Sequence, residues 1–452
     1  MKVHFIAIGG SAMHNLAIAL KINGFEVSGS DDEIFEPSKS RLEKYGLLPG
    51  QSGWHPENIS GELDFIILGM HARLDNPELV RAQEMGLKIY SYPEFLYENS
   101  KNKKRVAIGG SHGKTTITAM VMHVLKYHGL NFDYLVGSKL RDFEVMVRVS
   151  NDAPIMVFEG DEYLSSPLDR RPKFHWYHPQ LALITGIAWD HINVFPTFEN
   201  YLQQFEEFVN LMEAGAKVVY NESDPNVKSV VEKSNNDIQK IPYTLPGYKI
   251  LNGITYLVDN KSFIPLKIFG KHNLMNLSGA LLLCEALGLN RAQFLKAIQS
   301  FEGADNRLEL VCQNHQGRMF KDFAHAPSKL KATLSAVREQ FPEQHLIACF
   351  ELHTFSSLNP EFLGQYKDAL NEADEAAVYF NPHALKIKRM AVLEPDDIKS
   401  AFGRTDLQVF DDSKGMEQWL LEKSGSDHIF LMMSSGNFNG MDLPDLGKKL
   451  LE

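Results

Sequence analysis

The sequence predicts an α/β protein with three domains: a Rossmann-like N-terminal domain, a central P-loop ATPase domain and a Rossmann-like C-terminal domain. The length of 452 residues exceeds what a single hydrophobic core usually supports. Short apolar runs of strand length alternate with segments of helical apolar spacing, which is typical of parallel sheets covered by helices. Two of these runs, ending at Ile8 and Ile108, lead into glycine turns that open helices, and such turns bind nucleotides.

The N-terminal domain is predicted over residues 1–100. Its first elements are expected in the order strand, tight turn, amphipathic helix, strand, at residues 3–8, Gly9-Gly10, 12–22 and 25–28. This order opens a doubly wound nucleotide-binding unit. The polar, charged segment at residues 99–104 is interpreted as the linker that ends the domain.

The first turn departs from the dinucleotide fingerprint. His14 stands where the last glycine of that fingerprint would lie, so NAD is not expected. Asp31, about twenty residues beyond the turn, is placed to bind a ribose or sugar hydroxyl. A plain turn carboxylate is the alternative interpretation. The loop from His71 to Pro77 follows a buried strand at residues 64–69, and such folds bind ligands at this edge of the sheet.

The glycine-rich segment at residues 105–116 is the strongest motif. A buried strand at residues 106–108 precedes it, and helical apolar spacing follows from Ile117. Backbone amides of such a turn surround phosphate oxygens, Lys114 reaches the outer phosphates, and the Thr115 hydroxyl ligates Mg²⁺. The formal P-loop motif would place its first glycine at Ile108, so this loop is one residue tighter.

We interpret this segment as a nucleoside triphosphate site rather than as a turn that merely favours glycine. Gly-Lys-Thr at a helix start, directly after a buried strand, supports that choice. The residues assigned to ATP by this motif are Gly109, Gly110, Ser111, His112, Gly113, Lys114, Thr115 and Thr116.

Acidic residues end a neighbouring strand. The apolar run at residues 155–158 leads into Glu159, Asp161 and Glu162, and a carboxylate at this position suits a nucleotide-bound Mg²⁺. The next strand, at residues 181–187, leads into Asp190-His191, so His191 is a candidate second metal ligand. Acidic strand ends are common and a lone histidine is usually structural, but their combination beside a phosphate loop favours a metal site.

Two further features are placed in and after the central domain, which is predicted over residues 101–305. Asn273 and Asn276 precede a helix expected at residues 277–287 and share a face of its first turn. They would hydrogen-bond an adenine or cap that helix, and the sequence leaves both open. Arg307 is a phosphate-clamp candidate at the second domain boundary.

The C-terminal domain is predicted over residues 306–452 as a second doubly wound unit. Its strands and helix are expected at residues 319–325, 328–341 (the helix), 346–350, 376–380 and 428–433. The loop at residues 434–440 follows the last strand, so polar groups gather at strand ends.

Composition limits the partners. The net charge is −11, from 46 basic and 57 acidic residues, so no nucleic-acid partner is expected. No apolar stretch approaches the roughly 18 residues that span a membrane, and residues 1–5 lead into a strand rather than a signal peptide. Three distant cysteines in apolar surroundings suggest a reducing compartment, so a cytoplasmic location is expected. Whether the protein is a monomer or a homodimer stays open.

Taken together, these motifs resemble the Mur ligase family, which joins amino acids or peptides to a UDP-linked muramic acid. The resemblance runs the length of the chain and rests on Ile8-Gly-Gly, residues 109–116, Glu159-Gly-Asp-Glu-Tyr163, Asp190-His191, residues 272–276, Arg307 and Asp322-Phe-Ala-His325. Within the family, residues 29–31, 41–46, 142–145 and 163–174 are similar to the branch that attaches a preformed peptide. The branch that attaches L-alanine is the alternative.

The resemblance implies a role for each matching residue. Lys114 and the amides of residues 109–113 hold the ATP phosphates, Thr115 and Glu159 hold one Mg²⁺, and His191 helps to hold a second. The residues implied to face the adenine, or to reach ATP from later in the chain, are His272, Asn273, Asn276, Arg307 and Asp322. UDP-N-acetylmuramate is expected on the first domain, at Gly9, Gly10, Ser11, Asp31 and His71.

The implied reaction is ATP-dependent amide formation. The lactyl carboxylate attacks the γ-phosphate, and the incoming amine then attacks the resulting acyl phosphate. Lys114, Mg²⁺ and Arg307 would neutralise charge during phosphoryl transfer, and His325 would help with the amine proton. Lys114, His191, His325 and Arg307 are therefore the implied catalytic residues, and closure of the last domain would complete the site. A protein that binds the UDP-sugar without turnover is the rival from another class.

The sequence departs from the family pattern in three places, of which the last concerns the acceptor more than the ligase chemistry. Gly160 replaces an alanine of the acidic cluster, and Ala326 stands where relatives carry a second histidine. Residues 351–358 lack the arginine that relatives use near the acceptor carboxylate. His353 and Ser356 are candidate acceptor contacts there, with a plain surface loop as the alternative.

Overall fold

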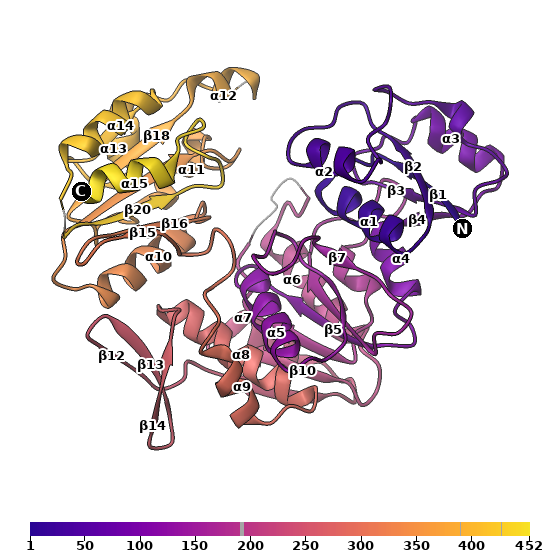
Figure 1. Ribbon diagram of the computed structural model, residues 1–452, viewed down its shortest axis with the longest axis horizontal. Helices are drawn as coiled ribbons and strands as arrows, with labels where there is room; N and C mark the ends of the chain where they lie inside the picture. Colours follow the sequence, from indigo (N-terminus) through magenta and orange to yellow (C-terminus); the bar gives the residue numbers. More distant parts are fainter. Residues whose placement is uncertain (190–193, 389, 426) are drawn as a thin grey trace. The chain divides into compact units, whose positions relative to one another are not determined.

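The computed structural model describes residues 1–189, 194–388, 390–425 and 427–452 (Figure 1). The chain divides into two compact units. The first contains residues 1–245 and 275–298, and the second contains residues 246–274 and 299–452. Each unit is described by itself below.

The N-terminal part of the first unit is a four-stranded parallel sheet in the order β2-β1-β3-β4. Its strands are β1 (Lys2–Ile6), β2 (Glu26–Ser30), β3 (Phe65–Leu68) and β4 (Ile89–Ser91). Its helices are α1 (Ser11–Ile22), α2 (Ser38–Lys44), the 3-10 helix η1 (Pro56–Asn58), α3 (Pro77–Glu84) and α4 (Tyr92–Glu98). Every residue of β3 is buried, as expected for a parallel strand covered on both faces. The predicted Rossmann-like arrangement is confirmed.

The rest of the first unit is built on a seven-stranded sheet in the order β11-β10-β9-β5-β8-β6-β7, parallel except for β7. Its strands are β5 (Lys104–Gly109), β6 (Asp133–Leu135), β7 (Val147–Arg148), β8 (Ile155–Gly160), β9 (Leu181–Ile184), β10 (Lys217–Asn221) and β11 (Gln239–Tyr243). Its helices are α5 (Lys114–Tyr127), the 3-10 helix η2 (Lys173–Trp176), α6 (Phe198–Asn210), α7 (Pro225–Lys233), α8 (Lys271–Ala286) and α9 (Arg291–Ile298). The first four residues of α8, up to Leu274, belong to the second unit. Because β5 lies between β9 and β8, the glycine turn and the acidic strand end share one edge.

The second unit contains a six-stranded sheet in the order β15-β16-β20-β17-β18-β19, parallel except for β15. Its strands are β15 (Glu309–Gln313), β16 (Arg318–Asp322), β17 (Leu346–Leu352), β18 (Glu375–Phe380), β19 (Gln408–Phe410) and β20 (Ile429–Met433). Its helices are α10 (Pro327–Gln340), α11 (Pro360–Leu363), the 3-10 helix η3 (Gly364–Tyr366), α12 (Pro382–Ile387), α13 (Pro395–Phe402), α14 (Ser413–Glu422) and α15 (Leu443–Leu451). This confirms the second doubly wound unit.

Two features differ from the sequence prediction. A three-stranded antiparallel sheet, β12 (Tyr248–Leu251), β13 (Ile254–Asp259) and β14 (Ser262–Leu266), was not predicted. Helix α8 begins at Lys271, directly after Gly270 with its positive φ of 87°, and not at residue 277. Asn273 and Asn276 therefore lie within this helix instead of before it.

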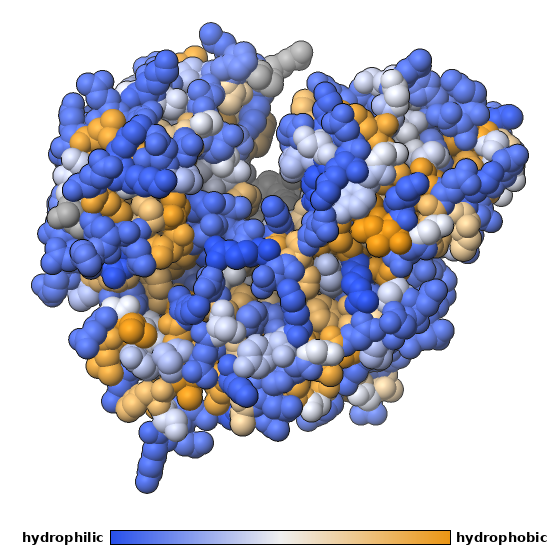
Figure 2. Space-filling view, in the orientation of Figure 1, coloured by the Kyte–Doolittle hydropathy of each residue, from blue (hydrophilic) through white to orange (hydrophobic). Residues whose placement is uncertain are grey.

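The hydropathy of the surface and the state of the three cysteines can be compared with what the composition predicts. Hydrophilic residues predominate on the face shown in Figure 2, with apolar residues scattered between them. Among the described helices, none combines the length and the hydropathy that crossing a membrane requires. Cys284 and Cys349 are buried, Cys312 is partly buried, and all three are free thiols.

Candidate active site

The turn between β5 and α5 has the backbone of a phosphate loop. Gly110 and Gly113 have φ values of 125° and 80°, in the left-handed region that favours glycine. A Cβ at Gly110 would lie 2.1 Å from the Thr185 hydroxyl oxygen, so this position also requires the absence of a side chain. Gly113 is the N-cap of α5, and the helix dipole is directed at the turn.

Polar contacts hold the turn against the segment that follows β9. The Ser111 amide donates to the Gly186 carbonyl (2.9 Å), and its hydroxyl donates to the Ala188 carbonyl (2.8 Å). The Thr185 hydroxyl donates to the carbonyl of His112, and the Thr185 amide donates to that of Gly109 (3.0 Å). In this structure the amide and the hydroxyl of Ser111 both fix the loop, and its contact with phosphate stays a prediction.

Lys114 begins α5 and points back across the turn. Its Nζ donates to the Gly110 carbonyl (2.6 Å) and to Glu162 Oε2 (2.6 Å). Burial alone would lower the pKa of Lys114, but the carboxylates of Glu162, Asp161 and Glu159 outweigh that effect and raise it. Lys114 therefore stays cationic near neutral pH, as a phosphate-binding lysine requires.

Thr115 and Glu159 meet beside Lys114. The Thr115 hydroxyl donates to Glu159 Oε1 (2.8 Å), and the Gly137 amide donates to Glu159 Oε2 (2.7 Å). A hydroxyl and a carboxylate oxygen at this separation are hard ligands that suit Mg²⁺, with nucleotide phosphates and water as the remaining ligands. The structure thus brings together two of the three predicted metal ligands. His191, the third, lies outside the described residues.

The sequence did not indicate how the remaining acidic residues are paired. Glu162 Oε1 accepts a hydrogen bond from the Tyr201 hydroxyl (3.0 Å), and Asp161 pairs with Lys173 (2.5 Å). Burial alone would raise the pKa of Asp161, but Lys173 and Lys114 outweigh it and lower the pKa. The available signal for this cation–carboxylate cluster was the acidic run at residues 159–162, followed by the basic residues Arg170, Arg171 and Lys173.

Only one of the two asparagines of α8 lies in the first unit. A Cβ at Gly113 would lie 2.4 Å from Asn276 Oδ1, so the Asn276 side chain packs directly against the phosphate loop. In the second unit, Asn273 Nδ2 donates to the Phe269 carbonyl (3.0 Å), and Gly270 lies against His272. Asn273 therefore does not act as the helix cap that the sequence left open.

Arg307, Asp322 and His325, the candidate site residues that come later in the chain, lie together in the second unit. The Arg307 guanidinium stacks over the Phe323 ring at 4.6 Å from its centroid. The Asp322 carboxylate accepts hydrogen bonds from the amides of Leu308 (2.6 Å) and Ala324 (2.8 Å), which fixes the end of β16. His325 contacts the Phe323 carbonyl through Nδ1 (2.9 Å). In this arrangement Asp322 positions the chain around Arg307 and His325.

In the N-terminal sheet, the Asp31 side chain lies against the first glycine turn, at Gly9 and Gly10. The Gly9 amide donates to Asp31 Oδ2 (2.6 Å), and a Cβ at Gly9 would lie 2.9 Å from that oxygen. Burial, together with the neighbouring Asp32, raises the pKa of Asp31 from 3.8 to about 6. Gly10 is the N-cap of α1, and Ser11 is its exposed first residue.

The loop that contains His71 forms one wall of a cleft in the first unit. The cleft has a volume of about 420 Å³ and is lined by Met70, Ala72, Arg73, Leu74, Asp75, Pro167 and Arg170. One wall follows β3 and the other follows the acidic end of β8, so the cleft lies between the N-terminal sheet and the phosphate-loop sheet. His71 is exposed in that loop but does not line the cleft.

Family models and individual relatives match this chain along its length. The matching models are "Mur ligase family, catalytic domain" at residues 2–104, "Mur ligase middle domain" at residues 108–284 and "Mur ligase, glutamate ligase domain" at residues 306–436. A UDP-N-acetylmuramate–L-alanine ligase of Caldicellulosiruptor bescii is 31% identical over 391 residues, which are 83% of this chain and 83% of the relative.

Two relatives named for peptide ligation match the whole chain. A UDP-N-acetylmuramate–L-alanyl-γ-D-glutamyl-meso-2,6-diaminoheptandioate ligase of Haemophilus influenzae is 26% identical, over 100% of this chain and 99% of the relative. The crystal structure of a murein peptide ligase from Psychrobacter arcticus 273-4 superposes with a TM-score of 0.66 at 21% identity, over 100% of this chain and 99% of that chain. The structural likeness concerns the fold.

Proposed function

The chain belongs to the Mur ligase family, whose three-domain members are ATP-dependent ligases that form amide bonds, and from this premise we propose that it joins a preformed peptide to UDP-N-acetylmuramate. The peptide is L-alanyl-γ-D-glutamyl-meso-diaminopimelate, and the process is peptidoglycan recycling. One observation carries the ligase chemistry: Lys114, Thr115 and Glu159 converge on a left-handed glycine turn. The free cysteines fit a reducing compartment, so we place the enzyme in the cytoplasm.

The phosphate loop suits the activation step of this reaction. Lys114 and the amides of the turn would bind the ATP phosphates, while Thr115 and Glu159 would hold Mg²⁺. The bound metal supplies charge neutralisation at the phosphates. The lactyl carboxylate then attacks the γ-phosphorus, ADP leaves, and a carboxyl–phosphate anhydride forms. Lys114 keeps its proton throughout, because three carboxylates surround it.

Amide formation follows on the same carbonyl. The amine attacks, a tetrahedral intermediate forms, phosphate leaves, and the amine gives up a proton. His325 is our candidate acceptor for that proton, because the Phe323 carbonyl holds its Nδ1 and fixes the ring. Arg307, stacked on Phe323, is the candidate cation that stabilises the transferred phosphoryl group.

UDP-N-acetylmuramate, called the donor below, is proposed to bind the N-terminal sheet and to reach the phosphate loop through the cleft. Gly9, Gly10, Ser11, Asp31 and the loop of His71 lie at the carboxyl edge of that sheet, where doubly wound sheets bind ligands. The cleft supports this proposal, because one of its walls continues from that edge and the other continues from the acidic end of β8.

Ligation of L-alanine is the second candidate function. The relative at 31% identity is named for it, whereas the relative named for the tripeptide matches nearly end to end at 26%. We favour the tripeptide because residues 29–31, 41–46, 142–145 and 163–174 are similar to the peptide-ligating branch.

An acceptor panel tests the proposal. Phosphate release is measured with ATP, Mg²⁺ and UDP-N-acetylmuramate plus either the tripeptide or L-alanine, and the product is identified by its mass. We expect kcat/KM for the tripeptide to exceed that for L-alanine by at least about 100-fold, as a site built around polar groups of its substrate allows. The reverse preference would replace the proposal with the L-alanine ligase, and ADP formation without any amide product would reject both.

A further inference from the structure

The helix that follows the first glycine turn carries a buried histidine that the mechanism above does not use. His14 lies on α1, at the position where a dinucleotide-binding turn has its last glycine, and it is 1% exposed. A buried imidazole needs hydrogen-bond partners for its two ring nitrogens. The turn itself, α1 and α2 supply these partners.

The partners of His14 determine where its proton lies. Nδ1 lies 2.9 Å from the Gly10 carbonyl oxygen, which only accepts, so Nδ1 carries the proton and donates. Nε2 lies 3.2 Å from Arg41 Nη1 and 3.0 Å from Asn15 Nδ2, which only donate, so Nε2 is unprotonated and accepts. Burial lowers the pKa of His14 and the charge of Arg41 adds to this effect, against the hydrogen bond with Gly10. The ring is therefore a neutral acceptor for Arg41.

Arg41 and Asn15 connect this ring to the phosphate-loop sheet. Arg41 Nη2 donates to the Glu144 carbonyl (3.0 Å), in the loop between β6 and β7. Asn15 Oδ1 accepts from the Met146 amide (3.0 Å), at the end of the same loop. Both contacts are made with backbone groups, so they hold the loop itself. We call His14, Asn15 and Arg41 the α1–α2 clamp.

The loop that the clamp holds also holds Glu159. The Val136 amide donates to the Met146 carbonyl (2.9 Å) and closes the base of the loop. The next residue, Gly137, donates its amide to Glu159 Oε2 (2.7 Å), and a side chain at Gly137 would displace this carboxylate. A short series of hydrogen bonds thus leads from the Gly10 carbonyl, in the turn assigned to the donor, to the carboxylate assigned to Mg²⁺.

We propose that the α1–α2 clamp positions the reactants of the ligation: it holds the turn that binds the donor at the distance from Glu159 that attack of the donor carboxylate on ATP needs. This inference rests on the proposed ligase function. The donor and ATP are assigned to turns of two different sheets, so their reacting ends meet only if these turns are held at a fixed distance. A misplacement of about 1 Å costs on the order of 100-fold in rate. His14, Asn15 and Arg41 act through the backbone and are positioning residues.

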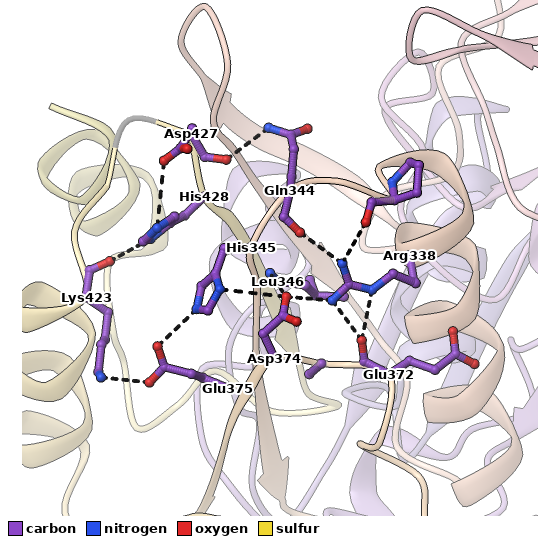
Figure 3. A network of polar contacts seen from close by, with 12 residues as sticks. Arg338, Gln344, His345, Leu346, Glu372, Asp374, Glu375, Lys423, Asp427 and His428 are labelled. Carbon is purple, nitrogen blue, oxygen red and sulfur yellow. Dashed lines mark hydrogen bonds and ion pairs between the residues drawn. The ribbon is translucent and has the colours of Figure 1, made fainter.

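A histidine network elsewhere in the chain shows how the clamp differs from an ordinary surface network. In Figure 3, His345 lies directly before β17 and contacts Glu375 Oε1 (3.0 Å), whose other oxygen binds Lys423 (2.7 Å). The His345 side chain is 38% exposed and faces carboxylates, whereas His14 is buried and its Nε2 faces N–H donors. The network in Figure 3 joins β17, β18 and α14 of a single sheet. His345 is therefore the control residue for His14.

The test compares His14→Leu, His14→Gln and Arg41→Met with two matched controls, His345→Leu and Lys44→Met. Lys44 lies one turn from Arg41 on α2 and binds the same residue, Glu144, but through the exposed side chain of that residue (2.5 Å). Arg41 is partly exposed, so Arg41→Met keeps the core intact if His14→Leu does not fold. Phosphate release is measured with ATP, Mg²⁺, UDP-N-acetylmuramate and whichever acceptor, the tripeptide or L-alanine, the wild type uses.

The kinetic effect should appear in kcat. We expect His14→Leu and Arg41→Met to lower kcat at least about tenfold, while KM for ATP stays within about twofold because the phosphate loop is intact. The double variant should lower kcat no further than one substitution alone, since both break the same connection. His14→Gln should retain most of the wild-type kcat, because its amide oxygen can accept from Arg41. Both controls should keep kcat within about twofold.

Hydrogen exchange tests the clamp without turnover or ligands. The amides of residues 136–147 should exchange at least about tenfold faster in His14→Leu and Arg41→Met than in the wild type, because the loop loses contacts to its backbone. The same segment should exchange at the wild-type rate in His345→Leu and Lys44→Met.

The inference is overturned if exchange of residues 136–147 is unchanged in Arg41→Met, if kcat is unchanged where exchange is faster, or if Lys44→Met has the same effects as Arg41→Met. Turnover of either acceptor without an effect of Arg41→Met would reject this inference and leave the ligase proposal standing. Turnover of neither acceptor by the wild type would reject the ligase proposal and this inference with it. Preference for L-alanine with the Arg41 effect intact would reject the tripeptide assignment and support this inference.

Discussion

The first unit contains two strand–turn–helix motifs, after β1 and after β5, that look alike in sequence. They differ in which glycine of the turn is sterically constrained. In the turn after β1, Gly9 is the constrained position, because a Cβ there would lie 2.9 Å from Asp31 Oδ2. In the turn after β5, Gly109 has only ordinary contacts, whereas a Cβ at Gly110 would overlap Thr185 at 2.1 Å. Gly10 has a φ of −58° and room for a methyl group.

This difference indicates which kind of ligand suits each of the two turns. In the turn after β1, the Gly9 amide donates a hydrogen bond to the buried Asp31 carboxylate. The first turn of α1 contains neither a lysine nor an acidic residue. The turn after β5 has left-handed glycines, the cation of Lys114 and the Thr115–Glu159 pair. The second turn is thus suited to a metal-bound triphosphate, and the first to a hydroxyl-bearing ligand with fewer charges to neutralise.

The largest effect is expected for Lys114→Ala. Loss of this cation at the transferred phosphate should lower kcat on the order of 10³-fold, as for other charge-stabilising groups in phosphoryl transfer. Glu159→Ala should behave similarly, and excess Mg²⁺ should not restore it. Both should leave UDP-sugar affinity nearly unchanged, since that ligand is assigned to the other turn. Calorimetry with the UDP-sugar is the measurement, and loss of its binding in folded Lys114→Ala would contradict the assignment.

The second prediction compares neighbouring glycines of the phosphate loop. Gly110→Ala would force an alanine into φ 125° and against the backbone nitrogens of Thr185 and Gly186. We expect this variant to lose at least about 3 kcal/mol of unfolding free energy and its ATP affinity. In Gly109→Ala the added Cβ would have its nearest contact with the Phe174 ring, at 3.4 Å. The unfolding free energy of this variant should therefore fall by about 1 kcal/mol or less. Equal losses in chemical denaturation of the two variants would show that the loop backbone is not the constraint.

Much of this loop was accessible to sequence reasoning, because its signal is local. Gly109 to Thr116 between a buried strand and a helix predicts the turn, the lysine and the hydroxyl. The acidic cluster offers three carboxylates, and the sequence does not say that Glu159 faces Thr115 while Glu162 faces Lys114. The contact of Asn276 with Gly113 joins distant parts of the chain, so no local pattern indicates it.

The unpredicted three-stranded sheet did have a local signal. Asn252-Gly253, between apolar residues, is the preferred pair for a two-residue hairpin turn. Both residues have positive φ (53° and 72°), as that turn requires. The hairpin of β12 and β13 could therefore have been predicted, whereas the early start of α8 could not, since its first residues also suit a loop before a helix.

The third prediction concerns Asp31→Asn and pH. The pKa of Asp31 is about 6 in the folded protein, above its ordinary 3.8, so the folded state binds more protons than the unfolded state between these values. The unfolding free energy of the wild type should therefore fall relative to Asp31→Asn as pH rises from 4 to 6, and stay lower above pH 6. We expect Asp31→Asn to be more stable at pH 7.5 by roughly 1 kcal/mol.

The same variant should bind the donor more weakly. If Asp31 accepts a hydrogen bond from a sugar hydroxyl, the KM for UDP-N-acetylmuramate should rise about tenfold in Asp31→Asn. Melting temperatures across pH 4 to 8 and donor KM are the two measurements. A more stable variant with unchanged donor KM would reduce Asp31 to a turn carboxylate that only holds Gly9.

The smallest effect is expected for Gly10→Ala, and it tests why a glycine is present there at all. The nearest atom to the added Cβ is Met13 Cγ at 3.5 Å, and the φ of −58° suits any residue, so the unfolding free energy should change by no more than about 0.5 kcal/mol. A glycine that the fold does not need points to close approach of a ligand to the backbone. Donor KM should then rise a few-fold while ATP KM stays constant, the opposite of Gly110→Ala. If donor KM stays at its wild-type value, the turn after β1 holds its ligand through Asp31 and the helix end, and not through the Gly10 backbone.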